Sequence, residues 1–364
     1  MSISIHALKK SFGDFQVSVD LELGDSELLV LAGPSGCGKS SALNLISGLV
    51  EADSGSISIN GTDISGVPTW KRGIGLVFQD SALFPHLTVE KNIAYGPFIA
   101  GKPKEERNGL ANHYVQALRL MGCEKRRVQT LSGGEKQRVA IARSLAANPR
   151  VLLMDEPFSS LDAPLRREFR TEFRELRERE GFPCIFVTHD REEAAIMADR
   201  IAVMRDGRII ETGTPQELFF APRTAFVAEF LGLGTVLPVL GSSSQTLGST
   251  LIVCALGKIR IPFAFEPGAA LLVPNDALRI MGRGAANDGR GGLILNGLVT
   301  ELGFEGERFI VRIQIADGTI LCALSNRRET APKPGEYIQA ELDPSLLRFV
   351  SLDPPHLGVN QGNS

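Results

Sequence analysis

A glycine-rich run at residues 33–40 constrains this chain more than any other feature. It reads Gly-Pro-Ser-Gly-Cys-Gly-Lys-Ser, and it lies between an apolar run at 28–32 and a helix-like segment at 41–49. The spacing G-x-x-x-x-G-K-S in a strand, loop and helix setting is typical of phosphate binding. Its glycines let backbone N–H groups point at phosphate oxygens, and the helix N-terminus adds partial positive charge. The sequence therefore predicts a phosphate-binding loop.

Two side chains at the end of this loop have distinct predicted roles. Lys39 is expected to neutralise the β- and γ-phosphates of a nucleotide, and Ser40 to ligate Mg²⁺, because a hard cation prefers oxygen ligands. Cys37 is given no catalytic role, although its place at a helix N-terminus favours a lowered pKa and a reactive thiol. The predicted nucleotide contacts of the loop are Gly33, Pro34, Ser35, Gly36, Cys37, Gly38, Lys39, Ser40 and Ser41.

Composition and charge exclude several classes of protein. With 364 residues, of which 43% are hydrophobic and 22% charged, the chain is an ordinary globular protein of two or three domains. Its formal net charge of -3 provides no basic field, so no nucleic-acid partner is expected. Five cysteines without a C-x-x-C pair argue against a zinc site or a disulfide framework. No apolar stretch approaches the roughly 20 residues that span a bilayer, and the N-terminus lacks a signal-peptide layout, so we expect a cytoplasmic protein.

Beyond the loop, apolar strand-like runs alternate with helical stretches up to about residue 202. This alternation predicts an α/β fold with a largely parallel sheet. Three runs, at 74–78, 151–154 and 184–187, are each followed directly by polar residues. Ligands bind at the carboxyl ends of strands in open α/β sheets, so chemistry is predicted at this edge. The polar residues at the strand ends are Gln79, Asp155, Glu156, Thr188 and His189.

These strand-end residues are predicted to share the chemistry of phosphate hydrolysis. Asp155 is placed to hold, directly or through water, the Mg²⁺ that Ser40 also contacts. Glu156 cannot point the same way, and it is predicted to polarise the attacking water as general base. Gln79 would order water or metal, and His189 would bind the γ-phosphate and help to fix Glu156. Taken singly, Gln79 and His189 also fit structural polar residues at strand ends.

A second helix start made of small residues follows at 131–135, where the sequence reads Leu-Ser-Gly-Gly-Glu before an apolar helical stretch at 139–147. Its N–H groups and the Ser132 hydroxyl are free to bind a phosphate. A single nucleotide does not need two phosphate-binding helix starts from the same subunit. With this motif, residues 3 to 235 resemble the ATP-binding subunits of ABC transporters. The matching segments are Gly33 to Ser40 as Walker A, Gln79 as the Q-loop glutamine, Leu131 to Glu135 as the signature, Val151 to Asp155 as Walker B, Glu156 as the catalytic glutamate, Ser160-Leu161-Asp162 as the D-loop and His189 as the switch histidine.

The resemblance implies a head-to-tail homodimer that holds two ATP molecules between its subunits. Ser132, Gly133 and Gly134 would then act on the nucleotide of the other subunit, and Asp162 is taken as a further contact with it. The family has an aromatic residue that stacks on adenine, and Phe12 matches it, with Phe15 as the competing candidate. The cofactors implied are ATP and Mg²⁺.

Residues from about 80 to 150 are consistent with the helical subdomain that meets the membrane permease in this family. Phe84 and Leu87 either form an exposed docking patch or pack inside the subdomain. After residue 234 the runs become short and β-like, and 309–315 alternates with period two before an Asp-Gly turn at 317–318. This part resembles the barrel-like regulatory domains of ABC importer ATPases. It would stabilise the dimer, and binding of a regulator is left open.

The sequence thus predicts an α/β P-loop NTPase domain at 1–235, a smaller all-β OB-like barrel domain at 236–352 and a flexible tail at 353–364. Residues 282–292 are expected to form a flexible glycine-rich loop. The resemblance implies an ATPase that drives import of a polyamine, ferric iron or an oxyanion such as sulfate or molybdate. Its partners would be a permease and, indirectly, an extracytoplasmic solute-binding protein, at the inner face of the cell membrane. A soluble ABC ATPase without a transport role, or the motor of a separate-subunit exporter, is the alternative.

Overall fold

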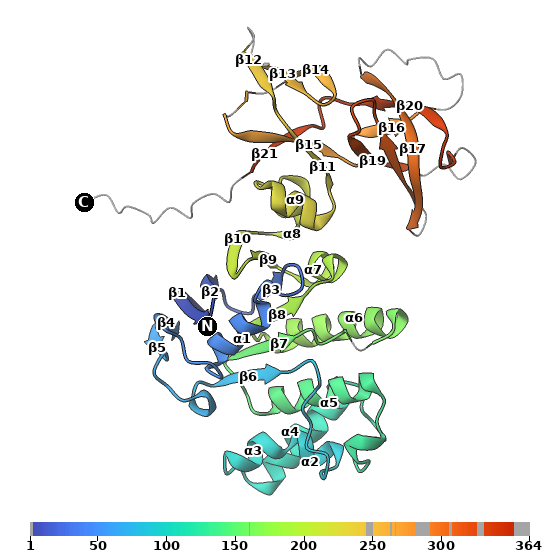
Figure 1. The fold of residues 1–364 in the computed structure, drawn as a ribbon. Helices are drawn as coiled ribbons and strands as arrows, with labels where there is room; N and C mark the ends of the chain where they lie inside the picture. Colours follow the sequence, from blue (N-terminus) through green and yellow to red (C-terminus); the bar gives the residue numbers. More distant parts are fainter. Residues whose placement is uncertain are drawn as a thin grey trace. The chain divides into compact units, whose positions relative to one another are not determined.

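The computed structural model describes residues 3–159, 161–244, 250–262, 264–265, 267–281, 292–305, 308–325 and 331–352 (Figure 1). The chain divides into two compact units, Met1–Pro215 and Gln216–Ser364. Residues 282–291 of the predicted glycine-rich loop, Ser160 of the D-loop and the predicted tail from 353 lie outside the described residues. No helix in the described ranges is long and apolar enough to span a bilayer.

The first unit is built on a ten-stranded sheet with the order β5-β4-β1-β2-β10-β9-β3-β8-β7-β6. Strands β9, β3, β8, β7 and β6 pair in parallel, as the alternation of strands and helices predicted. The strands are β1 (Ile3–Phe12), β2 (Phe15–Leu23), β3 (Leu28–Ala32), β4 (Ser54–Ile59), β5 (Thr62–Asp63), β6 (Ile74–Val77), β7 (Val151–Asp155), β8 (Cys184–Thr188), β9 (Arg200–Arg205) and β10 (Arg208–Gly213). Every residue of β3 and β8 is buried, which explains why these strands read as continuous apolar runs.

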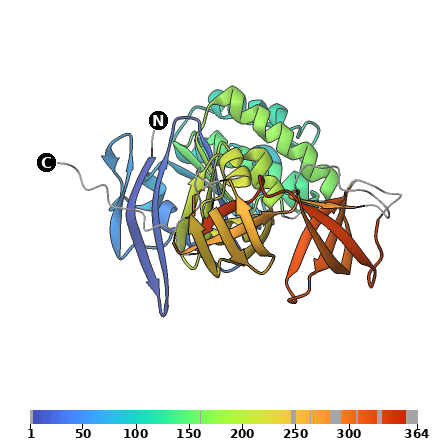
Figure 2. The ribbon, with the colours of Figure 1, turned by 90° about the horizontal axis from the view of Figure 1, so that it is seen from above.

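The other half of this sheet is largely antiparallel, a feature that the prediction of a largely parallel sheet did not include. Strands β1 and β2 form the long hairpin drawn in dark blue in Figure 2, and β4 pairs with the outer edge of β1. Strand β10 returns antiparallel to β9 through a turn at Asp206 and Gly207, which both have positive φ. An Asp-Gly pair is typical of the tight turn of a β-hairpin.

The helices of the first unit fall into two groups. Helices α1 (Lys39–Ser47) and α7 (Arg191–Met197) contact strands of the sheet, and α6 (Ala163–Glu180) follows β7. Helices α2 (Val89–Ile93), α3 (Tyr95–Ile99), α4 (Lys104–Ala117) and α5 (Gly133–Ala146) pack on one another at 89–146, and short 3-10 turns lie at Thr69–Lys71 and Val128–Thr130. Buried Arg138 of α5 bonds Glu172 of α6 and lies over the Phe169 ring, 4.4 Å from its centre. This contact fixes α5 to α6.

Phe84 and Leu87 are both half-buried on the segment between β6 and α2. The Phe84 ring lies 4.2 Å from that of Tyr95, centre to centre, and the Arg143 guanidinium lies 5.2 Å from its centre. Phe84 therefore packs against neighbouring side chains and remains partly exposed. A role for this pair in docking a permease stays a prediction.

The second unit consists of short antiparallel strands in three sheets, with the orders β11-β15-β21, β12-β13-β14 and β16-β20-β17-β18-β19. Edge strands β16 and β19 of the five-stranded sheet approach each other, so that this sheet curls into a nearly closed barrel, as expected of an OB-like domain. The strands are β11 (Gly234–Pro238), β12 (Gly241–Ser244), β13 (Thr250–Cys254), β14 (Gly257–Ile261), β15 (Ala269–Pro274), β16 (Leu278–Ile280), β17 (Leu293–Glu305), β18 (Arg308–Gln314), β19 (Ile320–Ser325), β20 (Tyr337–Leu342) and β21 (Arg348–Ser351).

Two short helices, α8 (Pro215–Phe220) and α9 (Ala225–Leu231), precede these strands. Ala225 and Ala228 of α9 form a small core with Ala270 and Leu272 of β15 and Val350 of β21. The second compact unit begins at Gln216 and therefore includes α9. The domain limit predicted after residue 235 stays a prediction.

Candidate nucleotide-binding and catalytic site

Sheet topology brings the predicted site residues to one edge of the first unit. The glycine-rich loop follows β3, Gln79 follows β6, Asp155 ends β7 and His189 follows β8. These four strands are parallel neighbours in the order β3-β8-β7-β6. Their carboxyl ends therefore meet at the same edge, where open α/β sheets bind ligands.

The glycine-rich loop has a backbone that requires its glycines. Gly36 and Gly38 have φ of 79° and 104°, values that residues other than glycine rarely adopt. A Cβ at Gly33 would lie 2.8 Å from the Cys37 sulfur and closer still to the Met204 carbonyl oxygen. The loop consequently turns tightly between β3 and α1, which begins at Lys39.

Lys39 is buried within this loop, with 6% of its surface exposed. Its Nζ donates hydrogen bonds to the carbonyl oxygens of Gly33 and Pro34, both at 2.8 Å. The ammonium charge is thus held inside the turn, beside the backbone that is predicted to receive phosphate. A compact cation at this point fits the expected anion.

Cys37 differs from the reactive thiol that its position suggested. It is buried, and its sulfur lies 3.8 Å from the Lys39 Nζ. Burial raises the pKa of Cys37, and the nearby Lys39 charge only partly opposes this effect. The helix N-terminus does not outweigh the loss of water around the sulfur, so the thiol stays protonated at neutral pH.

Asp155 and Ser40 supply the oxygen atoms that a magnesium ion would need. Oδ1 of Asp155 is buried and has no hydrogen-bond partner within the described part of the chain. Burial is the main cause that raises the pKa of Asp155, while a hydrogen bond from the Ser40 side chain and the Lys39 charge lower it. An unpartnered carboxylate oxygen beside a hydroxyl fits a hard divalent cation.

Protein groups alone would not enclose that cation. Among the described ranges, no group of three or more His, Cys, Asp or Glu side chains is arranged to hold a metal. Mg²⁺ commonly binds through one or two protein oxygens together with substrate phosphates and water. The pair of Asp155 and Ser40 therefore suits a metal that arrives with a nucleotide.

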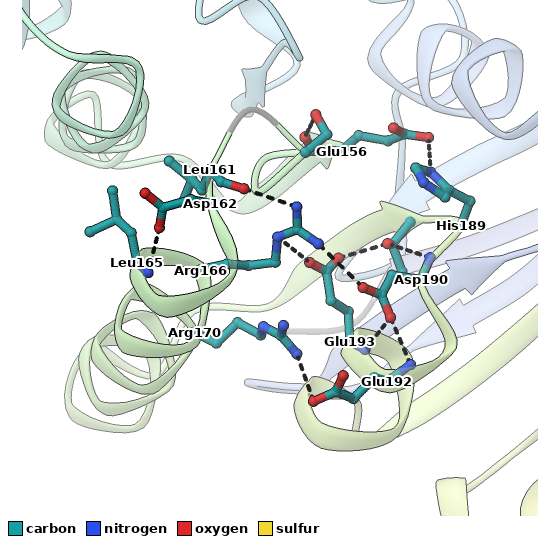
Figure 3. A network of polar contacts seen from close by, with 12 residues as sticks. Glu156, Leu161, Asp162, Leu165, Arg166, Arg170, His189, Asp190, Glu192 and Glu193 are labelled. Atoms are coloured by element: carbon teal, nitrogen blue, oxygen red, sulfur yellow. Dashed lines mark hydrogen bonds and ion pairs between the residues drawn. The ribbon is translucent and has the colours of Figure 1, made fainter. Parts of the chain in front are cut away.

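The Glu156 side chain meets that of His189, as Figure 3 shows. Its Oε1 lies 2.9 Å from Nδ1 of His189, and its backbone N–H donates to the Val187 carbonyl at 3.0 Å. Glu156 has φ of 43°, an uncommon value for a residue with a side chain, and such strain is often found at active sites. The Glu156 side chain is 21% exposed and the His189 side chain 55%, so both are open to a substrate.

Gln79 is exposed beyond the end of β6, at the same sheet edge. The side-chain hydrogen bond that Asp155 receives comes from Ser40 and not from Gln79. The sheet topology thus brings Gln79 to the correct edge, and its predicted role toward water or metal depends on contacts with a ligand.

The predicted signature lies at the start of α5, where Ser132 is the N-cap. The Ser132 Oγ accepts a hydrogen bond from the Glu135 N–H at 3.2 Å, and Oε2 of Glu135 accepts one from the Ser132 N–H at 2.7 Å. This capping box orders the helix start. Gly134 is buried, and a Cβ there would lie 2.8 Å from Leu165 Cδ2 of α6. The absence of a side chain at Gly134 lets this end of α5 approach Leu161 and Leu165 closely.

Asp162 likewise caps a helix. Its Oδ1 accepts a hydrogen bond from the Leu165 N–H at 2.9 Å at the start of α6, where Pro164 occupies the first turn. The predicted nucleotide contact of Asp162 would have to be made in addition to this cap.

Phe12 and Phe15 face each other across the turn between β1 and β2. Phe12 is 41% exposed, whereas Phe15 packs against the core beneath the glycine-rich loop, near Gly38. Exposure leaves the Phe12 ring available to a base, since aromatic faces stack with broad tolerance. Its assignment to adenine stays a prediction.

Sequence reasoning missed a polar network behind the Glu156–His189 pair. It involves Arg166 of α6, Asp190 at the N-cap of α7 and buried Glu193. The only local signal was an Asp followed by two Glu at a helix start, which predicts a capped helix and no more. The partners come from elements distant in sequence.

Comparisons with known proteins agree with this arrangement. The sequence profile of the family described as ABC transporter matches residues 17–159. A relative from Streptomyces coelicolor, named Fe(3+) ions import ATP-binding protein FbpC, is 39% identical over 349 residues, which cover 94% of each chain. A Rubrobacter xylanophilus relative, named Spermidine/putrescine import ATP-binding protein PotA, is 36% identical over 355 residues, or 94% of this chain and 92% of its own.

A third relative matches a shorter part of the chain at higher identity. It comes from Rhizobium etli, carries the name Fe(3+) ions import ATP-binding protein FbpC, and is 46% identical over 238 residues, which cover 65% of this chain and 67% of its own. Identity well above 30% over nearly the whole length, together with a phosphate-loop site at the parallel sheet edge, leaves one conclusion. The chain belongs to the ABC transporter family, as an ATP-binding subunit that hydrolyses ATP.

Proposed function

We propose that this chain is the motor of an importer for ferric iron or a polyamine, working as a homodimer on a separate membrane permease. The observation that carries the proposal is the convergence of buried Lys39, the unpartnered Asp155 carboxylate and the Glu156–His189 pair at one sheet edge. The import direction is supported by the names of the relatives that match 94% of the chain.

In the proposed site, the glycine-rich loop binds the phosphates of ATP. The N–H groups of residues 33–41 and the Lys39 ammonium compensate their negative charge. Asp155 and Ser40 would hold Mg²⁺, which supplies charge compensation between the β- and γ-phosphates. Gln79 orders water at the same edge, and the exposed Phe12 ring stacks on the adenine.

Glu156 is proposed to accept a proton from the water that attacks the γ-phosphate. A general base needs hydrogen-bond reach and a fixed orientation, and the 2.9 Å contact with His189 orients the carboxylate. The strained backbone at Glu156 and its bond to Val187 keep the side chain on this side of β7. His189 remains open enough to donate to a phosphate oxygen through its other ring nitrogen.

A second copy of the chain is proposed to complete each site. The helix start at Ser132, Gly133 and Gly134 presents backbone N–H groups of the kind that bind phosphate, and the loop with Asp162 lies beside it through Leu161 and Leu165. In the proposed dimer these groups act on the nucleotide of the other subunit. Closure and reopening of the dimer drive a permease at the inner face of the membrane, and no nucleic acid is involved.

The solute is proposed to be ferric iron or a polyamine, since the two near-full-length relatives carry these names at similar identity, 39% and 36%. An oxyanion remains the further prediction made from the sequence. The permease and the solute-binding protein would contact the solute, so this chain should set the energy supply and not the selectivity.

Uptake measurements in source cells test the proposal. In cells that carry the wild-type chain or Lys39→Ala, we would measure the uptake of labelled ferric iron, spermidine, sulfate, molybdate, thiamine or a sugar. Lys71→Ala, which changes an exposed lysine outside the site, is the matched control. We expect Lys39→Ala to abolish uptake of ferric iron or spermidine and to leave the other solutes unchanged. Loss of sulfate or molybdate uptake alone would make an oxyanion the solute in place of ferric iron or a polyamine. Unchanged uptake of every solute at equal expression would contradict the importer proposal.

A further inference from the structure

Arg166 connects two segments that flank the catalytic pair. Its Nη2 donates a hydrogen bond to the Leu161 carbonyl oxygen at 2.9 Å, within the loop that precedes α6. Its Nη1 lies 3.5 Å from Oδ2 of Asp190, and its Nε lies 3.8 Å from Oε1 of Glu193. Figure 3 shows this one guanidinium between the Leu161 loop on one side and the start of α7 on the other.

From Glu193 the contacts continue to the residue before His189. Oε2 of Glu193 accepts a hydrogen bond from the Thr188 hydroxyl at 2.7 Å, and the Thr188 oxygen accepts one from the Asp190 N–H at 3.0 Å. Glu193 is only 4% exposed. Burial raises the pKa of Glu193, and the nearby Arg170 and Arg166 charges lower it, so the arginines favour the ionised carboxylate. His189 is therefore held between two residues, Thr188 and Asp190, that belong to this network.

A small cavity separates the network from the catalytic pair. Its volume is about 60 Å³, enough for water, and both groups line it. The lining residues are Glu156, Ser159, Arg166, Thr188, His189, Asp190 and Glu193. Displacement of Arg166 would reshape this cavity directly.

We propose that Arg166 is a positioning residue that transmits the position of the Leu161 loop to His189 through Asp190, Glu193 and Thr188. Leu161 precedes Asp162, which the proposed function assigns to the dimer interface, so the inference rests on that function. Approach of a second subunit would shift the Leu161 loop, and Arg166 would then adjust the contact between His189 and Glu156. A site would hydrolyse ATP fully only when its own interface loop is seated.

An arginine is required for this task. The planar guanidinium presents several donors in fixed directions, so it contacts a carbonyl and two carboxylates at once. Lysine would keep the charge but has one flexible ammonium, and it would lose the link between the segments. Arg166→Lys therefore separates loss of charge from loss of connection.

The test uses single-turnover hydrolysis by the full-length protein in excess over ATP, which keeps slow variants measurable. The variants are Arg166→Gln, Arg166→Lys and Thr188→Val. The control is Arg174→Gln, because Arg174 lies on the same helix, is exposed and pairs with the exposed Glu178. We expect the first three to lower the rate of hydrolysis about tenfold with ATP affinity nearly unchanged, since small misplacements of catalytic groups cost this much or more. Arg174→Gln should match the wild type.

A double-mutant cycle distinguishes positioning from general support of the fold. If Arg166 acts through His189, Arg166→Gln should lower the rate by less than about twofold in a His189→Ala background. A full additional loss in that background, or an equal loss in Arg174→Gln, would overturn the inference. Thr188→Val, which keeps the size of the side chain, answers the case in which Arg166 variants fail to fold.

The outcomes also separate this inference from the proposed function. If His189→Ala alone hydrolyses ATP at the wild-type rate, the proposed catalytic assignment fails. If His189→Ala is impaired while Arg166→Gln and Thr188→Val are not, the assignment stands and the positioning role is rejected.

Discussion

His189 Nδ1 lies 2.9 Å from Glu156 Oε1, and the two residues directly follow neighbouring parallel strands, β8 and β7. The contact is therefore a product of sheet register. Because Asp155 pairs with Val187 across these strands, Glu156 leaves the sheet edge level with Thr188, one residue before His189. A carboxylate held in this way is oriented before any substrate binds.

Glu156→Gln should bind ATP and lose hydrolysis. The amide keeps the shape of the side chain but cannot accept a proton from water, and general bases contribute about 100-fold or more to rates. We expect phosphate release to fall by that factor and an ATP-bound dimer to accumulate on size-exclusion chromatography. Glu175→Gln, the same change at an exposed position of α6, should behave as wild type. Hydrolysis near the wild-type rate in Glu156→Gln would contradict the role of general base.

Gly33→Ala should distort the phosphate loop. The added methyl group would press on the Met204 backbone carbonyl and on the Cys37 sulfur. Relief of these contacts would require a shift of β9, of the loop, or of both. We expect a loss of stability of about 1 to 3 kcal/mol, as for other severe steric changes in tight turns, and at least tenfold weaker ATP binding. Urea unfolding and titration with a fluorescent ATP analogue measure the two effects. Gly66→Ala, where a methyl group meets open space, is the control, and equal behaviour of the two variants would refute the argument.

Sequence alone could predict the site residues that depend on local backbone and on strand ends. The phosphate loop contains glycines that adopt positive φ. Asp155, Glu156 and His189 come at the ends of apolar runs that form buried strands. Parallel pairing then brings these ends together, which follows from the alternation of strands and helices. The β-rich character of the second unit was readable for the same reason, because alternation within a strand is local.

Contacts between distant elements could not be predicted in this way. The pairing of Arg166 with Glu193 depends on how α6 and α7 pack, and no spacing rule reports it. The raised pKa of Cys37 depends on burial beneath Lys39, although the local pattern favoured a lowered value. The packing of α9 on β15 is likewise a contact between segments distant in sequence, made by a few buried side chains.

Glu135 should make stability depend on pH through its capping contact. The hydrogen bond from the Ser132 N–H is the main cause that lowers the pKa of Glu135, and the Ser132 hydroxyl, Cys123 and Arg126 add to it. As pH falls through the ordinary value of 4.5, the unfolded chain takes up the proton first, and the folded chain follows at lower pH. The stabilisation is therefore present above 4.5 and is lost as pH falls through the folded pKa.

The matching variant is Glu135→Gln, compared with Glu175→Gln. Urea unfolding at neutral pH should show a loss of about 0.5 to 1 kcal/mol for Glu135→Gln, the usual value of a capping contact. The difference from wild type should shrink as the pH is lowered below 4.5. A difference that stays constant over this range would show that the charge of Glu135 does not contribute.

Ser81→Ala should loosen the link between the segment after Gln79 and helix α5. The Ser81 hydroxyl donates a 2.6 Å hydrogen bond to Oε1 of Gln137, a fully buried side chain whose Nε2 has no partner in the described part of the chain. Loss of the donor leaves a buried acceptor unsatisfied, which costs about 1 to 3 kcal/mol in the free energy of unfolding. Arg143, which donates to the Ala82 carbonyl at 2.7 Å, is a second contact between this segment and α5 that the substitution leaves in place.

A second substitution makes this prediction specific. Replacing both partners, as Ser81→Ala with Gln137→Leu, removes the unsatisfied groups and should recover most of the lost stability, because paired polar groups exchanged for apolar ones of similar shape are nearly neutral. Urea unfolding of wild type, both single variants and the double variant gives the interaction energy directly. Additive losses would mean that the hydrogen bond contributes little. Recovery of the free energy of unfolding in the double variant would show that the Ser81–Gln137 hydrogen bond holds the segment after Gln79 against helix α5.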